Sequence, residues 1–359
     1  MRECLLTGLV AAALCYVLTP FIRNMAIRFK AMADVRERDI HNVSTPRWGG
    51  VSMWLAMGLT LLFAQHMRLV GRAYSRELLG IFLAATFVLI LGAIDDKFEL
   101  DAVTKLAGQA LAGGILLLNG VQVLWLPING VVILPANIGQ LLTVIIVVVI
   151  INAVNFIDGL DGLAVGVVAI AASCFFAFSY LLAVLNGFTR AGAPSLMTVI
   201  LVGLCVGFLA HNAYPARMFM GDSGSMFLGL MLAASAITLT GQIDANALSE
   251  ENGRSTLVPL LLPFAVLAIP LLDLIWAVVR RARSGKSPFA PDKLHLHHRL
   301  LDTGNSQTRT AIVLYLWTAT FAVPVTIAAF APLWIAILIG VVLLALSYFS
   351  RKRELTFSE

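Results

Sequence analysis

Charged residues are scarce in this 359-residue chain. Lys, Arg, Asp and Glu together make up 13% of it, whereas apolar residues make up 59%. A soluble domain has about 25% charged and roughly 45–50% apolar residues. So little charge cannot cover the surface of a soluble globule of this size, which excludes a soluble enzyme and a disordered chain. A polytopic membrane protein remains, and the mean hydropathy of +0.90 favours it.

Cysteine is scarce as well. The four cysteines lie in or beside apolar runs, and no two of them have the spacing of a metal site or a redox motif. This excludes a secreted disulfide scaffold. The alternating segments that a transmembrane β-barrel needs are also missing.

Long apolar runs are what the chain does contain. Their length of roughly 16–22 residues is what a helix needs to cross the hydrocarbon core of a bilayer. They predict an all-α polytopic integral membrane protein, a single domain over residues 1–359 with about eleven transmembrane helices. The expected spans are 4–22, 50–66, 77–94, 102–118, 139–154, 163–185, 195–211, 225–241, 256–278, 310–329 and 332–350. The segment 119–138 between two of them is expected to form a short hairpin.

The distribution of charge predicts the orientation. Lys and Arg favour the cytoplasmic side in short loops. With the N-terminus outside and the C-terminus cytoplasmic, 19 of the 25 Lys and Arg residues lie on the cytoplasmic side. Fifteen of the 20 carboxylates also lie there, although the rule does not concern Asp and Glu. This excess of both signs indicates an active site on the cytoplasmic face.

The first polar motif is the pair Asp95-Asp96, at the C-terminal end of a predicted helix. Two carboxylates there face the negative end of the helix macrodipole, at a cost of a few tenths to about 1 kcal/mol. Either they only begin the next turn, before Asp101 caps the following helix, or a nearby cation stabilises them.

The second motif is a run of four polar residues, Asn152, Asn155, Asp158 and Asp161. Their spacing of three residues places them near one face of a helix. Asn and Asp so close to the bilayer need partners. A helix cap would explain one of them, whereas four in register indicate a binding or catalytic site.

The third motif runs from His211-Asn212 to Asp222, where another helix is expected to begin. The free N–H groups of a helix N-terminus form an anion site, although Asp222 would also suit a plain N-cap.

The fourth motif lies in the longest cytoplasmic loop and contains His295, His297, His298 and Arg299. The spacing suits no common zinc site, so we expect these side chains to donate to phosphate or sugar oxygens. The basic residues 280–286 before them are explained by attraction to anionic lipid. Asp273, a carboxylate within a predicted span, either pairs with a basic residue or lines the site.

These residue types together indicate phosphoryl transfer. Mg²⁺ binds one or two carboxylates together with substrate phosphates, and Lys, Arg and His suit phosphate oxygens. We therefore expect a pyrophosphate-bearing substrate from the cytoplasm and a lipid substrate from the membrane, with catalysis by positioning and charge neutralisation.

The four motifs, in this order over residues 34–304, resemble those of the polyprenyl-phosphate N-acetylhexosamine-1-phosphate transferases. The segment His-Leu-His-His-Arg-Leu (295–300) is similar to that of the branch that uses UDP-N-acetylglucosamine (UDP-GlcNAc), including the bacterial undecaprenyl-phosphate GlcNAc-1-phosphate transferases. The resemblance implies transfer of GlcNAc-1-phosphate to undecaprenyl or decaprenyl phosphate, with release of UMP, in a bacterial cytoplasmic membrane. The partners would be UDP-GlcNAc, the lipid carrier and membrane lipids, with no nucleic acid; helix packing would also support a homodimer.

The resemblance also implies residue roles. Asp222 and Asn155 would bind Mg²⁺, with Mn²⁺ as an alternative, and Asp95, Asp96 and Asp158 would be catalytic. The substrate-binding set would be Asn152, Asp161, Asn212, His295, His297, His298 and Arg299, with His41 and Arg47 as weaker candidates. Asp95 would be either a nucleophile or the group that orients the lipid phosphate. We favour direct attack, because a phosphate monoester with a second pKa near 6 is largely dianionic at pH 7.

Three other functions are alternatives to this one. A phospho-MurNAc-pentapeptide transferase of peptidoglycan synthesis would share most of the motifs. A transporter for a nucleotide sugar or a lipid-linked sugar would place its site near the bilayer midplane, within repeated halves. A non-catalytic scaffold would not need Asp and Asn at this spacing.

Overall fold

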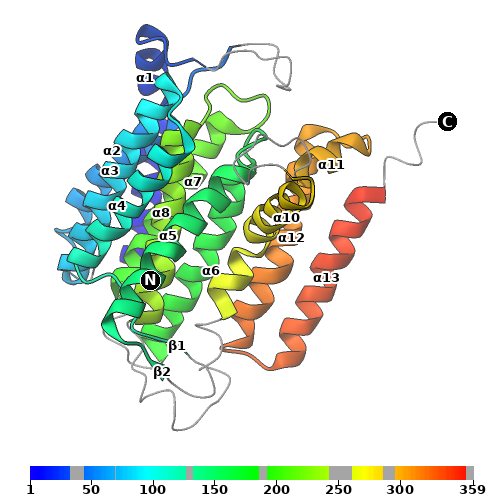
Figure 1. Cartoon of the computed structure of the whole chain (residues 1–359). Helices are drawn as coiled ribbons and strands as arrows, with labels where there is room; N and C mark the ends of the chain where they lie inside the picture. Colours follow the sequence, from blue (N-terminus) through cyan, green and yellow to red (C-terminus); the bar gives the residue numbers. More distant parts are fainter. Residues whose placement is uncertain are drawn as a thin grey trace.

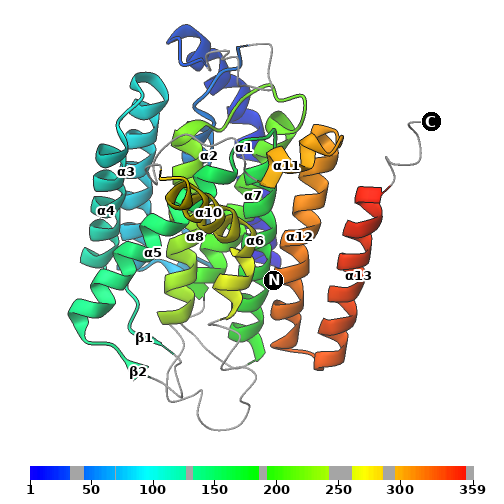
Figure 2. The ribbon, with the colours of Figure 1, turned by 45° about the vertical axis from the view of Figure 1, so that its right-hand side comes forward.

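The computed structural model describes residues 1–32, 44–68, 70–126, 132–185, 192–241, 261–285 and 296–352. Nearly all of this part is helical, and most helices run side by side in one bundle (Figures 1 and 2). Eight described helices are long and apolar enough to cross a membrane: α1 (Arg2–Arg28), α3 (Arg76–Phe98), α5 (Ala136–Ile157), α6 (Leu163–Leu185), α7 (Gly192–Asn212), α8 (Gly221–Gly241), α12 (Gln307–Ala328) and α13 (Leu333–Lys352). The prediction of an all-α polytopic membrane protein is confirmed.

Two further apolar helices are shorter. Helices α2 (Gly49–Ala64) and α4 (Ala102–Leu118) have 16 and 17 residues, which corresponds to about 24–26 Å. Ten of the eleven expected spans thus match one described helix each. A 3₁₀ turn, η1 (Val70–Ala73), lies between α2 and α3.

The expected span 256–278 is the one that differs. Residues 256–260 lie outside the described part, residues 261–266 are helical, and a separate helix, α10 (Ala268–Arg283), follows. The helix continues past 278 because its last turn carries three arginines, and cations stabilise the negative end of a helix. A short helix, α11 (Leu296–Asp302), comes next in the described chain.

The segment expected to be a hairpin contains two short strands. β1 (Trp125–Leu126) pairs antiparallel with β2 (Val132–Ile133), which confirms that prediction. This hairpin lies at one end of the bundle, at the opposite end of α5 from Asp158 (Figure 2).

Helix α8 forms the centre of the bundle. It packs against α2, α3, α5, α6 and α7. Of its most apolar 18-residue stretch, 89% is buried inside the bundle. Small residues allow this close packing: a Cβ added at Gly229 would lie 2.6 Å from the Cα of Ile151 on α5. Helix α13, by contrast, lies at the edge of the bundle beside α12 (Figure 1). The first residues of α8 therefore lie within the bundle, surrounded by the ends of α2, α3 and α5.

Candidate active site

The carboxylate of Asp96, at the end of α3, caps the N-terminus of α8. Its Oδ1 accepts a hydrogen bond from the backbone N–H of Asp222 (2.8 Å), and its Oδ2 accepts one from Ser223 (3.1 Å). Asp96 is 6% exposed. The positive end of the α8 macrodipole offsets the cost of placing this buried carboxylate at the negative end of its own helix.

Glycines make this contact between helices possible. A Cβ on Gly92 of α3 would lie 2.5 Å from the Cα of Ser223. Gly221 has φ +70°, and a Cβ there would lie 2.5 Å from Asp96 Oδ2. On the other side, the N–H of Gly49 donates to the carbonyl of Phe219 (3.1 Å). The start of α8 is therefore held between α2 and α3 by contacts that larger side chains would prevent.

Asp95 and Asp222 are joined by Lys105. The ammonium of Lys105, one turn into α4, forms an ion pair with the 2% exposed Asp95 and lies 3.2 Å from Asp222 Oδ2. The other oxygen of Asp95 accepts from the backbone N–H of Leu100 (2.7 Å). Lys105 was not among the predicted site residues, although its place one turn after the Asp101 cap could have indicated it.

The α4 cap is confirmed. Asp101 accepts hydrogen bonds from the backbone N–H groups of Val103 and Thr104, both at 3.1 Å. The hydrogen bond from the Thr104 hydroxyl, followed by these backbone bonds, lowers the pKa of Asp101. The cap fixes the first turn of α4, and so the position of Lys105.

Asn155 on α5 completes the cluster around Asp222. Its Nδ2 donates to Asp222 Oδ1 (2.7 Å) and to the hydroxyl of Ser225 (2.8 Å). The two residues predicted to bind a metal therefore lie in direct contact, and the side chain of Asp222 is 32% exposed.

Asp158, just after α5, is half-buried near the same cluster. Burial, followed by the charges of Asp222 and Asp96, raises the pKa of Asp158 to about 8, although the charge of Arg47 opposes this. Besides burial, the charges of Asp222 and Asp96 therefore lie close enough to Asp158 to disfavour its ionised form. Arg47 belongs to the segment before α2, whose Pro46 carbonyl accepts from the N–H of Phe219 (2.8 Å).

The oxygen-rich cluster suits a hard divalent cation. In the described part of the chain, no group of three or more His, Cys, Asp or Glu side chains is arranged to hold a metal ion. Asp222 would offer such a cation a carboxylate oxygen, and Mg²⁺ commonly takes its other ligands from phosphates and water.

Asp161 and Asn212 hold loops together. Asp161 Oδ2 accepts from the N–H of Ala216 (2.9 Å). Asn212 accepts from the N–H of Gly162 (3.1 Å) and donates to the carbonyl of Met218 (3.0 Å). These bonds attach the turn after α5 to the loop that leads into α8. That the two residues also bind substrate stays a prediction.

Asn152 has a partner deeper in the bundle. Its Nδ2 donates to Oε1 of Gln109 on α4 (2.5 Å) and to the carbonyl of Val148 (2.8 Å). These contacts of Asn152 link α5 to α4, one helical turn away from Asn155. Of the four residues in register, Asn155 contacts Asp222 and Asp158 is electrostatically coupled to it.

Two of the predicted histidines, His297 and His298, lie beside the α5–α6 turn. His297 on α11 is 3% exposed, and a Cβ on Gly159 would lie 2.4 Å from its Nε2. The ring of His298 lies 4.3 Å from that of His297. The guanidinium of Arg299 lies 6.0 Å from the Trp276 ring centroid. His295 and His41 lie outside the described residues.

Asp273 positions this helix. Its Oδ1 accepts from the backbone N–H of Leu296, the first residue of α11 (3.0 Å). The buried carboxylate of α10 thus fixes the start of the helix that carries His297 and His298. A second link to the site comes from Arg281, which is 4% exposed and lies 5.3 Å from the ring centroid of Phe156, next to Asn155.

Several known proteins are similar in sequence to this chain over most of its length. A decaprenyl-phosphate N-acetylglucosaminephosphotransferase of Mycolicibacterium smegmatis is 42% identical over 329 residues, which cover 90% of this chain and 81% of the relative. A probable undecaprenyl-phosphate N-acetylglucosaminyl 1-phosphate transferase of Bacillus subtilis is 28% identical over 91% of this chain and 86% of the relative. A phospho-N-acetylmuramoyl-pentapeptide-transferase of Desulforudis audaxviator is 31% identical over 86% of this chain and 91% of the relative.

The model of glycosyl transferase family 4 matches residues 78–240, the stretch that holds Asp95, Lys105, Asn155 and Asp222. Together with the 42% identity over nine-tenths of the chain, this match shows that the chain belongs to glycosyl transferase family 4, the family of the polyprenyl-phosphate GlcNAc-phosphate transferases.

Proposed function

We propose that this protein transfers GlcNAc-1-phosphate from UDP-GlcNAc to a polyprenyl phosphate, giving polyprenyl-diphosphate-GlcNAc and UMP. The observation that carries the proposal is the Asp95–Lys105–Asp222 cluster with Asn155, at one end of the helix bundle. The relatives at 41–42% identity act, by their names, on decaprenyl phosphate, which favours that carrier over undecaprenyl phosphate.

We propose Mg²⁺ as the cofactor, held by Asp222 with Asn155 beside it. When bound, the ion would neutralise charge on the diphosphate of the donor. The amide of Asn155 would present its oxygen instead of its nitrogen after a rotation that exchanges the two atoms, since hydrogen-bond partners alone assign them.

Direct attack by the lipid phosphate fits the environment of Asp95. One of its oxygens accepts from Leu100 and the carboxylate is paired with Lys105, so it is held in place and partly neutralised. An oxygen of the lipid phosphate would attack the phosphorus that bears GlcNAc, and the bond from that phosphorus to the UMP oxygen would break. Asp95 and Lys105 would orient the attacking phosphate, while His297 and His298 would contact the donor.

The proposed orientation places this cluster at the cytoplasmic face, with eleven crossings, the N-terminus outside and the C-terminus inside. The support is the charge distribution, with 19 of 25 Lys and Arg on that side. A cytoplasmic site would give direct access to a nucleotide sugar, as expected for an enzyme of a bacterial inner membrane.

The test is UMP release by purified protein with radiolabelled UDP-GlcNAc, decaprenyl phosphate and Mg²⁺. We expect UMP together with a labelled lipid, and loss of both with Asp222→Ala. UDP-MurNAc-pentapeptide, added unlabelled, should not compete; effective competition would instead indicate the peptidoglycan branch. A labelled Asp95 enzyme, isolated after incubation with β-³²P-labelled UDP-GlcNAc alone, would replace direct attack with a covalent intermediate.

A further inference from the structure

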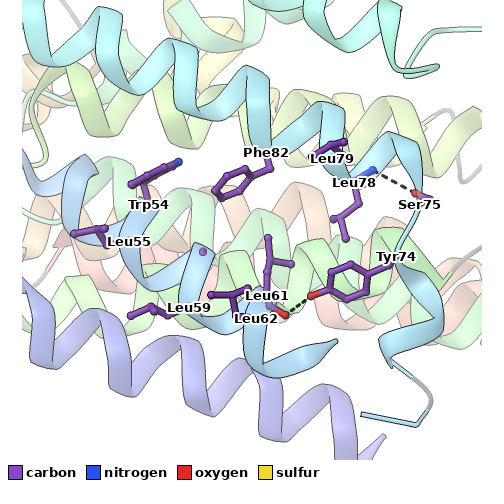
Figure 3. A pocket seen from close by; sticks show the side chains of 11 residues that line it. Trp54, Leu55, Leu59, Leu61, Leu62, Tyr74, Ser75, Leu78, Leu79 and Phe82 are labelled. Carbon is purple, nitrogen blue, oxygen red and sulfur yellow. Dashed lines mark hydrogen bonds between the residues drawn. The ribbon is translucent and has the colours of Figure 1, made fainter. Parts of the chain in front are cut away.

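A groove lies between α2 and α3, far from the Asp95 cluster. It encloses about 450 Å³, a size typical of small-molecule sites. Figure 3 shows its lining: Trp54 and Leu62 come from α2, Leu79 and Phe82 from α3, and Tyr74 from the linker between them. Leu62 and Leu79 are 58% and 55% exposed, so the groove opens towards the surrounding membrane.

The polar groups that line the groove already have partners within the protein. The indole N–H of Trp54 donates to the hydroxyl of Thr86 (2.9 Å). The hydroxyl of Tyr74 donates to the carbonyl of Leu61, and the hydroxyl of Ser75 accepts from the N–H of Leu78 (3.3 Å). The remaining surface is apolar, so the groove suits a hydrocarbon chain rather than a polar ligand.

Positive charge is concentrated at one end of the groove. The linker from α2 to α3 holds Arg68 and Arg72, α3 begins with Arg76, and between positions 65 and 80 the only acidic residue is Glu77. From outside this segment, the carboxylate of Glu3 accepts from the N–H of Val70 (3.1 Å).

Arg68 and Arg76 are exposed. The guanidinium of Arg76 donates one hydrogen bond to the carbonyl of Leu118 (3.2 Å), and its five N–H donors allow it to bind an anion as well. Because the 23 residues of α3 extend about 34 Å, more than the roughly 30 Å hydrocarbon core, the start of α3 and the linker before it are expected at headgroup depth. Guanidinium groups there match a phosphate headgroup.

The other end of the groove lies towards the active site, and a hydrogen bond crosses between the two helices there. The bond between Trp54 and Thr86 joins α2 to α3 at that end. Asp95 lies nine residues further along α3, or about 13 Å. A lipid with its phosphate at Asp95 would have to pass this bridge to fill the groove, whereas a lipid from the opposite leaflet enters directly.

We propose that the groove binds an acyl chain of an anionic bilayer phospholipid whose phosphate lies over Arg68 and Arg76, in the leaflet opposite the active site. Such a lipid fills the space between α2 and α3. Because it binds the folded protein, it stabilises the fold, including the end of α3 that holds Asp95 and Asp96.

The chain offers a matched pair of variants. A Cβ at Gly58, which lines the groove, would meet Phe82 at 3.7 Å, an ordinary contact, whereas a Cβ at Gly114 of α4 meets nothing within 4 Å. Gly58→Leu therefore fills the groove, and Gly114→Leu adds the same side chain outside it. Native mass spectrometry, with phosphatidylglycerol or phosphatidylethanolamine added to delipidated protein, would count bound lipids.

We expect the wild type and Gly114→Leu to bind phosphatidylglycerol in preference to phosphatidylethanolamine. Gly58→Leu should bind phosphatidylglycerol at least about tenfold more weakly, a loss of about 1.4 kcal/mol. In the double variant Arg68→Gln/Arg76→Gln, the two lipids should bind equally. These surface changes test the headgroup contact even if Gly58→Leu fails to fold.

Three results would overturn the proposal. The first is unchanged phosphatidylglycerol binding by a folded Gly58→Leu. The second is equal binding of the two lipids by the wild type. The third is displacement of the bound lipid by decaprenyl phosphate in the wild type, which would assign the groove to the acceptor's tail.

Discussion

The carboxylate of Asp96 accepts a 2.8 Å hydrogen bond from the backbone N–H of Asp222, so one acidic residue caps the helix that begins beside another. The two residues are 126 positions apart, and their contact joins α3 to α8. Both oxygens of Asp96 accept hydrogen bonds from backbone N–H groups at the start of α8. Asp96 therefore positions Asp222.

Asp96→Asn should therefore lower stability as well as activity. The amide keeps one acceptor oxygen, loses the charge and turns an NH₂ group towards a helix N-terminus. Loss of one charge-assisted bond corresponds to about 1.5–3 kcal/mol. Thermal unfolding in detergent should show a lower Tm. Asp101→Asn, at an exposed cap that accepts an amide, is the control and should unfold close to the wild type; equal Tm values for Asp96→Asn and wild type would contradict this role.

Lys105→Met should reduce turnover per folded molecule. It should also lower stability, because it leaves the buried carboxylate of Asp95 without its ion-pair partner. Lys105 neutralises Asp95 and Asp222 at the end of the bundle, and removal of a preorganised charge from an active site costs about 10²–10³ in kcat. Lys105→Arg should recover part of the lost turnover. The control is Lys97→Met, since Lys97 is exposed and its ammonium lies 5.4 Å from the Phe98 ring centroid. Equal activities of the two Met variants would exclude a role for Lys105.

Mg²⁺ should stabilise the protein in the absence of substrate. The cluster around Asp222 carries excess negative charge, and a ligand that binds only the folded state raises the free energy of unfolding in proportion to RT ln(1 + [L]/Kd). Tm measured against Mg²⁺ concentration should rise for the wild type and stay flat for Asp222→Asn. Asp161→Asn, whose carboxylate binds the N–H of Ala216 instead, should keep the rise.

Stability without divalent ions should fall as the pH rises. Burial and neighbouring charges raise the pKa of Asp158 to about 8, compared with about 3.9 in an unfolded chain. Between these values the folded state binds the extra proton, so its contribution is complete below about pH 4 and is lost as the pH passes about 8. Tm in EDTA should drop between pH 6 and pH 8.5, and Asp158→Asn should flatten the curve. An equally steep curve in that variant would assign the titration to another group.

The sequence predicted the elements better than the contacts between them. Run length locates helices because a bilayer sets the length of a span, and ten expected spans match helices. Asn155 and Asp222 were both among the predicted site residues, because polar residues beside apolar runs need partners, and the structure brings them into contact. The pairing of Asp96 with α8 and of Lys105 with two carboxylates depends on how distant helices pack, which no local pattern encodes. The break between residues 261–266 and α10 was not predicted, because the apolar composition of the chain continues through it.

The contact of Asp273 with α11 should affect substrate binding indirectly, through the position of that helix. Asp273 lies on α10 and binds the first N–H of α11, so Asp273→Ala should loosen α11 and the two histidines that it carries. We expect a higher KM for UDP-GlcNAc with a smaller change in kcat, because the cluster around Asp222 stays intact. Hydrogen exchange should become faster in α11 and remain unchanged in α8. Asp273→Asn keeps an oxygen that accepts the Leu296 N–H and should restore both KM and exchange rate. If Asp273→Asn shows the same rise in KM and the same faster exchange as Asp273→Ala, the negative charge of Asp273 is required. Asp273 would then do more than accept the Leu296 N–H.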